Sequence, residues 1–186
     1  MKKINDTWIV IFGILFFLVS YMFDDSISSF FKKIQLPFLD VILSIITNFG
    51  VVIVLMLLIP SFMLYRKDKK LVYLLLLSFV ASIILVFIAK LIFLRQRPLD
   101  AFAYPFINII NYSFPSMHSA VAFALLPILA KHLSKQRVFW ILLAFFVAFS
   151  RVYLGFHFLS DVVFGSLFGY FIGDWILELY EKGKLW

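Results

Sequence analysis

The sequence predicts an all-α membrane protein, a bundle of six transmembrane helices that forms a single domain over residues 1–186. Two features of the composition predict this class: 64% of the residues are hydrophobic with only 15% charged, and the mean hydropathy is +1.05. The third observation is the length of the apolar runs, because a helix needs about 20 such residues to cross a bilayer. A soluble domain of this size would carry far more polar surface.

Six apolar runs follow one another along the chain, and no low-complexity linker divides them. They cover residues 8–22, 41–65, 71–94, 116–130, 138–152 and 158–177. Each holds roughly 15 to 25 residues, so the shorter runs need flanking residues to complete a crossing of about 30 Å. The first run follows Lys2 and Lys3 as a signal peptide would, but no small-residue cleavage site comes after it, so we expect an anchoring helix.

Lys and Arg are distributed unevenly over the connections. Of the 17 cations, 11 fall on alternate connections that would share one side of the membrane: Lys2, Lys3, Arg66, Lys67, Lys69, Lys70, Lys131, Lys135, Arg137, Lys182 and Lys184. The positive-inside rule therefore predicts a multi-pass protein of the cell membrane with cytoplasmic N- and C-termini. The connection over residues 95–115 would lie outside, with its aromatic residues at headgroup level: Phe102, Tyr104, Phe106 and Tyr112.

The composition also excludes some functions. The chain has no cysteine, which excludes disulfides, a thiolate nucleophile and thiolate metal sites. The formal net charge of +7 does not indicate nucleic acid binding, because the cations are scattered between apolar spans. That distribution fits membrane orientation and an anionic substrate better.

Ionisable residues gather in three clusters at the ends of apolar runs. The clusters are Lys90 with Arg97-Pro98, then Pro115-Ser116-Met117-His118, then Ser150-Arg151 followed by His157 and Asp161. Ionisable side chains are costly at bilayer depth, so these clusters indicate a functional site. The charge distribution predicts that all three face the extracytoplasmic side.

The cations of these clusters are suited to binding a phosphate group. Arg97 and Arg151 can offer planar guanidinium groups to phosphate oxygens, and Lys90 can add a point charge. If the helix over 71–94 continued to Arg97, Lys90 and Arg97 would share one of its faces. Taken alone, Lys90 would be interpreted as snorkelling to the interface. Ser116 can contribute its hydroxyl to the phosphate or simply cap the following helix.

His157 and Asp161 are four residues apart at the start of the last predicted helix. At this spacing the carboxylate can reach one ring nitrogen and leave the other free, which is the arrangement expected of a nucleophilic imidazole. An alternative role for Asp161 is to cap the last helix, and this is compatible with catalysis. Asp161 is the only carboxylate in the predicted site, and two His among cations are a poor ligand set for Mg²⁺ or Zn²⁺. We therefore expect no metal and no cofactor.

The three clusters together resemble the signature of the type 2 phosphatidic acid phosphatase (PAP2) superfamily. The matching parts are Lys90-x6-Arg97-Pro98, Pro115-Ser116-x-His118 and Ser150-Arg151-x5-His157-x3-Asp161, in the family's order and spacing. The resemblance implies a six-helix membrane lipid phosphatase. It also implies a covalent phosphohistidine on His157 and general acid catalysis by His118, a residue that alone would be read as part of a helix start. Met117 is a departure, because the family usually has Gly before this His.

The last apolar run carries a glycine at every fourth residue. Gly165, Gly169 and Gly173 would form a smooth helix face that permits close packing of a second helix. We expect that packing within the bundle, with homodimer formation as the alternative.

The expected function is hydrolysis of a membrane lipid phosphate or diphosphate at the extracytoplasmic face. Polyprenyl diphosphate ranks first by family analogy, and phosphatidic acid and phosphatidylglycerol phosphate are further candidates. One alternative is a lipid headgroup phosphotransferase, which would use the same residues. The other is a non-catalytic lipid-binding or transport protein, which would need the cations but no His nucleophile with an orienting carboxylate.

Overall fold

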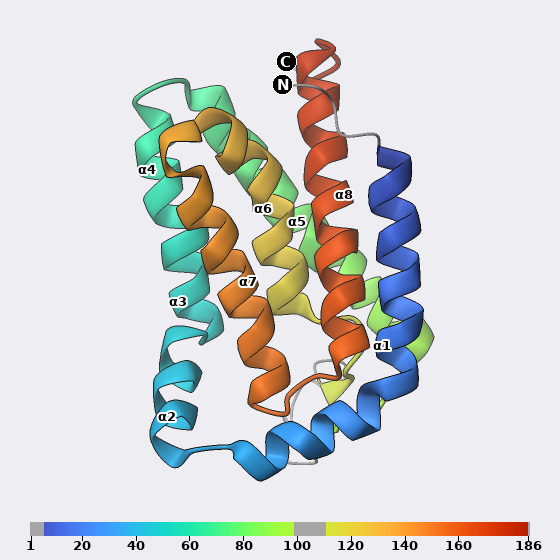
Figure 1. Ribbon diagram of the computed structural model, residues 1–186. Coiled ribbons are helices and arrows are strands. Elements are labelled where there is room, and N and C mark those ends of the chain that lie inside the picture. The colour runs from blue at the N-terminus through green and yellow to red at the C-terminus, as the bar shows by residue number, and fades with distance from the viewer. Residues whose placement is uncertain (1–5, 99–110, 186) are drawn as a thin grey trace.

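Regular structure in the described residues is entirely helical. The computed structural model describes residues 6–98 and 111–185, with α1 (Asp6–Ile34), α2 (Pro37–Ile46), α3 (Phe49–Ile53), the π-turn η1 (Val54–Leu58), α4 (Ile59–Tyr65), α5 (Lys69–Phe93), α6 (Met117–His132), the 3₁₀ turn η3 (Ser134–Gln136), α7 (Arg137–Tyr153) and α8 (Leu159–Glu181). The start of α1 and the end of α8 lie at the same end of the bundle (Figure 1). Among the described helices, four are long and apolar enough to cross a membrane, or five if the bent pair of α2 with 49–65 is one span. The six-span count and the side of the termini stay predictions.

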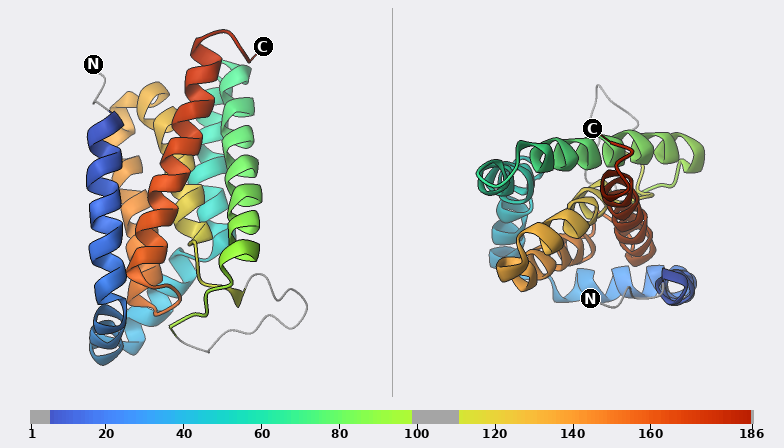
Figure 2. Two further views of the ribbon diagram at one scale, coloured as in Figure 1. Left: turned by 90° about the vertical axis from the view of Figure 1, so that its right-hand side faces the viewer. Right: turned by 90° about the horizontal axis from the view of Figure 1, so that it is seen from above.

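The helix α6 occupies the centre of the bundle. It packs against α5, α7 and α8, and it lies between them in the end-on view of Figure 2. Its 16 residues give a length of about 24 Å, which is short of the hydrocarbon thickness. Because neighbouring helices enclose α6, it does not have to match the bilayer. By contrast, α1, α5 and α7 expose large apolar side chains such as Phe12, Ile92 and Phe145, as lipid-facing surfaces do.

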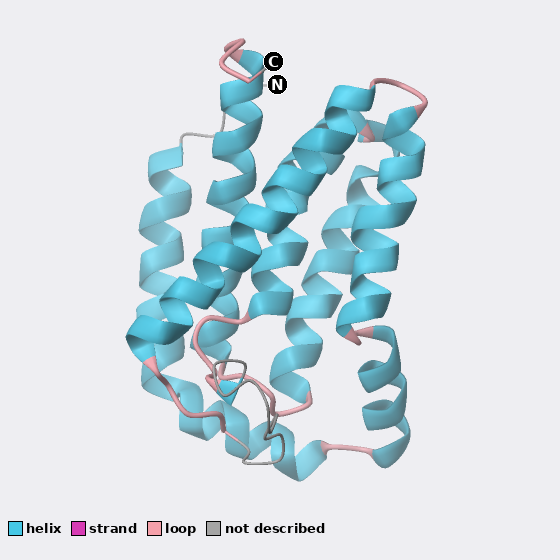
Figure 3. Ribbon diagram, turned by 180° about the vertical axis from the view of Figure 1, so that it is seen from behind, coloured by secondary structure: helices cyan, strands magenta, loops and turns pink. Residues whose placement is uncertain are grey.

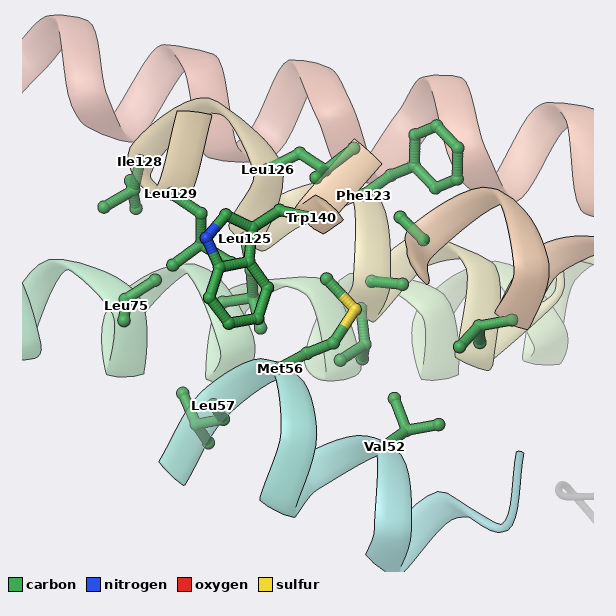
Figure 4. Packing of buried hydrophobic residues seen from close by; sticks show 14 of the residues in the cluster. Val52, Met56, Leu57, Leu75, Phe123, Leu125, Leu126, Ile128, Leu129 and Trp140 are labelled. Carbon is green, nitrogen blue, oxygen red and sulfur yellow. The ribbon is translucent and has the colours of Figure 1, made fainter. Parts of the chain in front are cut away.

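The main apolar core lies between α6 and the helices on three sides of it. Figure 4 shows Met56 of η1 and Trp140 of α7 packed near Leu125 and Leu129 of α6. On the back of the bundle, α5 crosses obliquely and covers this core (Figure 3). This apolar cluster extends along the helices as far as Val152 of α7 and Val162 of α8, next to the end where the polar groups gather.

The first predicted span is too short, because α1 continues to Ile34 instead of ending at residue 22. Its second half turns beneath the lower ends of α7 and α8 (Figure 1). Ser28 and Lys32 there line a polar cavity of about 270 Å³, while Ile27 and Phe31 line an apolar groove. The hydropathy of the chain falls after residue 22. The polar and apolar residues that follow still recur with the period of a helix, so the helix continues.

The second predicted span is not one straight helix. The segments Pro37–Ile46 and Phe49–Tyr65 meet at an angle of 48°. Asn48 begins the second segment, since its Oδ1 accepts a hydrogen bond from the Gly50 N–H at 2.9 Å and so satisfies a free donor of the helix start. The four later spans agree with prediction within four residues at each end. Phe102, Tyr104 and Phe106 of the predicted outer connection lie outside the described residues.

The glycine stripe of α8 lies against α6, within the bundle as predicted. A Cβ at Gly165 would lie 2.7 Å from the carbonyl oxygen of Ser116. Cβ atoms at Gly169 and Gly173 would collide with the carbonyl oxygens of Ala120 and Ala124. The two helices run in the same direction (Figure 1), so this close contact brings their N-terminal ends together.

Candidate active site

The three sequence clusters meet where α6 and α8 begin. The Ser116 N–H donates to the carbonyl oxygen of Asp161 at 3.1 Å, which joins the second cluster to the third. Arg97 Nη1 lies 3.5 Å from His157 Nε2, which joins the first to the third. His118 interacts electrostatically with four predicted site residues: His157, Arg151, Arg97 and Lys90. All seven predicted site residues therefore lie in one region of the molecule.

The three cations reach this region from different elements. Lys90 is only 2% exposed and its Nζ donates to the carbonyl of Tyr112 and, at 3.4 Å, to that of Ser113. Arg151, at the end of α7, is 8% exposed, and its guanidinium lies 4.3 Å from the Phe156 ring centre. Backbone carbonyls and a ring face thus fix the positions of these two buried side chains.

Arg97 does not extend the helix of Lys90, so the condition for a shared helical face is not met. The helix α5 ends at Phe93, and Leu94 has a left-handed φ of 49° that redirects the chain. Arg97 is instead held by carbonyl acceptors, with Nε 2.9 Å from Asn111 O and Nη1 2.8 Å from Phe156 O. Tertiary contacts thus set its position relative to Lys90.

His157 lies in the turn between α7 and α8, where its N–H donates to Arg151 O at 3.2 Å. Its two ring nitrogens have different surroundings. Nδ1 lies 3.4 Å from Ser113 Oγ and 3.7 Å from Asp161 Oδ2, whereas Nε2 lies near Arg97. Burial, followed by the charges of Arg97, Lys90 and Arg151, lowers the pKa of His157 well below its ordinary value. The imidazole is therefore neutral, with Nε2 as the nitrogen that faces the cations.

The Asp161 carboxylate lies between the start of α8 and the His157 side chain. It caps α8, because Oδ2 accepts a hydrogen bond from the Phe158 N–H at 2.9 Å. It also lies behind His157, although Ser113 Oγ donates to the same oxygen and is nearer to Nδ1. The sequence did not indicate Ser113, because this residue lies two positions before the Pro115-Ser116-x-His118 motif.

Two further charged residues were also missed, and they correct the view that Asp161 is the only carboxylate of the site. Arg95 Nη1 lies 2.7 Å from Asp161 Oδ1, and its Nη2 lies 2.8 Å from Asp24 Oδ2 on α1. Burial alone would lower the pKa of Arg95, but the carboxylates of Asp161 and Asp24 outweigh burial and raise it. The sequence signal that could have identified Asp24 is its position directly after the first apolar run, where an ionisable side chain is costly.

The second cluster contributes two site residues, Ser116 and His118, and one residue that packs on the core, Met117. The His118 ring packs edge-on against Phe49, with 5.0 Å between ring centres. Met117, which replaces the family's usual Gly, packs against the main apolar cluster. Over residues 6–98 and 111–185, no group of three or more His, Asp or Glu could hold a metal ion.

We expect acid to destabilise the protein partly through His157. Its pKa in the folded state lies below the ordinary value of 6.5, so the unfolded chain binds the proton first and stability falls as the pH drops below about 6.5. The groups that face the ring are Arg97, Lys90 and Arg151, with Asp161 on the Nδ1 side. Thermal unfolding in detergent between neutral and acid pH should show a shallower loss for His157→Gln. An identical slope for the two proteins would contradict this.

The chain is thus a helical bundle of membrane-protein composition that collects buried cations and two His at one end. A family model described as the PAP2 superfamily matches residues 71–184, and the chain belongs to this superfamily. Phosphatidylglycerophosphatase B of Bacillus subtilis (strain 168) is 32% identical over 175 residues, covering 87% of this chain and 85% of the relative. Undecaprenyl-diphosphatase of Sulfolobus acidocaldarius is 29% identical over 134 residues, covering 66% and 62%.

Two crystal structures have a similar fold. The transmembrane PAP2-type phosphatidylglycerolphosphate phosphatase from Bacillus subtilis superposes with a TM-score of 0.70 and 29% identity, covering 92% of this chain and 96% of the other. LpxE of Aquifex aeolicus superposes with a TM-score of 0.66 and 27% identity, covering 82% and 93%. With its apolar spanning helices and these relatives, the chain is a multi-pass membrane protein.

Proposed function

We propose that the protein is a lipid phosphate or diphosphate phosphatase that acts through a phosphohistidine on His157. One observation carries the proposal: a neutral imidazole directs Nε2 toward Arg97, while Ser113 and Asp161 lie on its Nδ1 side. A binding site alone needs the cations but not an oriented, neutral nucleophile.

The reaction proceeds in two steps with His118 as the proton carrier. In the first, His157 Nε2 attacks phosphorus, the bond from phosphorus to the leaving oxygen breaks, and His118 gives that oxygen a proton. In the second, His118 takes a proton from water, the hydroxide oxygen bonds to phosphorus, and the bond from Nε2 to phosphorus breaks. Lys90, Arg97 and Arg151 stabilise the charge on the three phosphoryl oxygens, and Ser116 adds its hydroxyl.

The substrate class is supported by the names of two relatives and by the apolar setting of the site. One relative is a phosphatidylglycerophosphatase and another an undecaprenyl-diphosphatase, so each is named for a phosphorylated lipid. A lipid keeps its tail in the bilayer while its phosphate reaches the lower end of the bundle. We retain polyprenyl diphosphate as the first candidate, followed by phosphatidylglycerol phosphate and phosphatidic acid.

An extracytoplasmic site is supported by the position of several loop cations at the opposite end of the bundle. Lys67 donates to the carbonyl of His132 at 2.6 Å, and Lys131 pairs with Glu181. These contacts join the connection before α5, the end of α6 and the end of α8, opposite His157 (Figure 1). Under the positive-inside rule that end is cytoplasmic. The site then opens to the outer leaflet.

We expect inorganic phosphate to be released from at least one of the three candidate lipids in detergent with no added acceptor alcohol. EDTA should leave the rate unchanged, because buried cations supply the charge that a metal would otherwise provide. A colorimetric phosphate assay over the lipid panel measures both points. Turnover that requires an added alcohol would indicate the phosphotransferase, and a rate abolished by EDTA would contradict metal independence.

A further inference from the structure

A buried charged network connects α1 to the candidate nucleophile. Asp24 of α1 is 3% exposed, and its two oxygens accept hydrogen bonds from the Ser160 N–H at 3.0 Å, from Ser160 Oγ and from Arg95 Nη2 at 2.8 Å. Arg95 in turn donates from Nη1 to Asp161 Oδ1 and to Ser160 Oγ, both at 2.7 Å. The resemblance to the family gave none of these roles to α1, Arg95 or Ser160.

The network holds Asp161 by both of its oxygens. Oδ1 is bound by Arg95, while Oδ2 accepts from Ser113 Oγ and from the Phe158 N–H. Since Asp161 Oδ2 and Ser113 Oγ are the groups beside His157 Nδ1, a shift of the carboxylate would move both partners of the imidazole. The ring nitrogen that carries the proton is set by these partners.

Arg95 is itself fixed on several sides. Its guanidinium lies 4.1 Å from the Phe158 ring centre and 5.2 Å from that of Tyr21. The two aromatic rings therefore contact the guanidinium in addition to the two carboxylates. The planar guanidinium of Arg95 binds Asp24 through one nitrogen and Asp161 through the other. The single ammonium group of a lysine cannot reproduce this geometry.

We propose that Asp24 and Arg95 are positioning residues that keep His157 in the tautomer with a proton on Nδ1 and a free Nε2. They act through Asp161 and Ser113 and do not touch the phosphate. This inference rests on the proposed function for its kinetic consequence, but the state of the imidazole can be measured without a substrate. A simple structural tie between α1 and α8 would affect stability and leave the imidazole unchanged.

The kinetic test uses Arg95→Lys and Asp24→Asn, which retain size while removing the fork or the charge. We expect kcat for lipid phosphate release to fall by about 10- to 100-fold with KM nearly unchanged, since misplacement by about 1 Å has effects of this size. In an Asp161→Asn background neither substitution should reduce kcat further. The matched control is Asp25→Asn, the exposed neighbour on α1, which should behave as the unsubstituted protein does.

A second measurement separates failure of this inference from failure of the proposed function. The chain has three His, so ¹⁵N-histidine spectra can be assigned with single His→Gln variants. His157 should show a protonated Nδ1 and an unprotonated Nε2 in the unsubstituted protein, and a mixed population in Arg95→Lys and Asp24→Asn. Unchanged ¹⁵N shifts in folded variants, or kcat losses that add to that of Asp161→Asn, would overturn the inference. Absence of phosphate release by the unsubstituted protein would count against the function alone.

Discussion

Replacing His157 by Ala should abolish phosphate release, with a loss of at least about 1,000-fold in kcat. The substitution removes the only protein atom that the proposed mechanism bonds to phosphorus. It should also abolish covalent labelling by a substrate with ³²P in its phosphate, and the label on the unsubstituted protein should be stable to alkali and labile to acid. Phosphate release in detergent and gel autoradiography measure the two effects.

The control for this substitution is His132→Gln. His132 lies at the opposite end of α6, where its carbonyl accepts a hydrogen bond from Lys67, so activity and labelling should be retained. Equal activity of His157→Ala and the unsubstituted protein would refute the nucleophile assignment.

The His118→Ala variant should lose about 100-fold or more in kcat on a lipid phosphate. It should lose much less on an aryl phosphate, whose leaving oxygen needs no proton.

Replacing Gly173 by Ala should destabilise the bundle strongly. The added Cβ would collide with the carbonyl oxygen of Ala124, which is backbone of a buried helix and cannot rotate away. Such overpacking costs about 3 kcal/mol or more when backbone must move, against a gain of about 1 kcal/mol in helix propensity. A net loss of about 2 kcal/mol or more corresponds to a drop of roughly 4–8 °C in Tm for a chain of this size. Thermal unfolding in detergent measures it.

Gly13→Ala is the matched control, because Gly13 is also packed against α8. Its Cβ would meet the Cδ1 atom of Leu167 at 2.7 Å, and this is the end of a flexible side chain that can change rotamer. We expect its Tm to stay close to that of the unsubstituted protein. If Gly173→Ala were as stable as Gly13→Ala, the contact between α6 and α8 would be looser than described.

The later helices could be predicted from sequence because their apolar runs coincide with their helical segments. For α5, α7 and α8, hydropathy and helix length change at nearly the same residues. In α1 they do not, because the helix continues for 12 residues beyond residue 22 with one polar and one apolar face. The bend at Asn48 was missed for the opposite reason, since the apolar run continues across a break in the hydrogen-bonding pattern.

The contacts of the candidate site also fall into two groups, those that follow from the local sequence and those that depend on the tertiary structure. His157 and Asp161 lie within one turn of each other along the chain, so their proximity follows from local geometry. Arg97 could not be placed by counting residues from Lys90, because Leu94 ends the helix between them. The contact of Arg95 with Asp24 joins residues 71 positions apart, and no local pattern predicts which buried carboxylate an Arg will select.

The sequence by itself determined the membrane class, the positions of the later helices and the inventory of charged groups, because each of these depends on composition or on neighbours along the chain. Only the tertiary structure decided that Ser113, Arg95 and Asp24 surround the His157–Asp161 pair. The physical reason is the parallel contact of α6 with the glycine face of α8. It brings two helix starts together and leaves α1 to supply the counter-charge from a distant part of the chain.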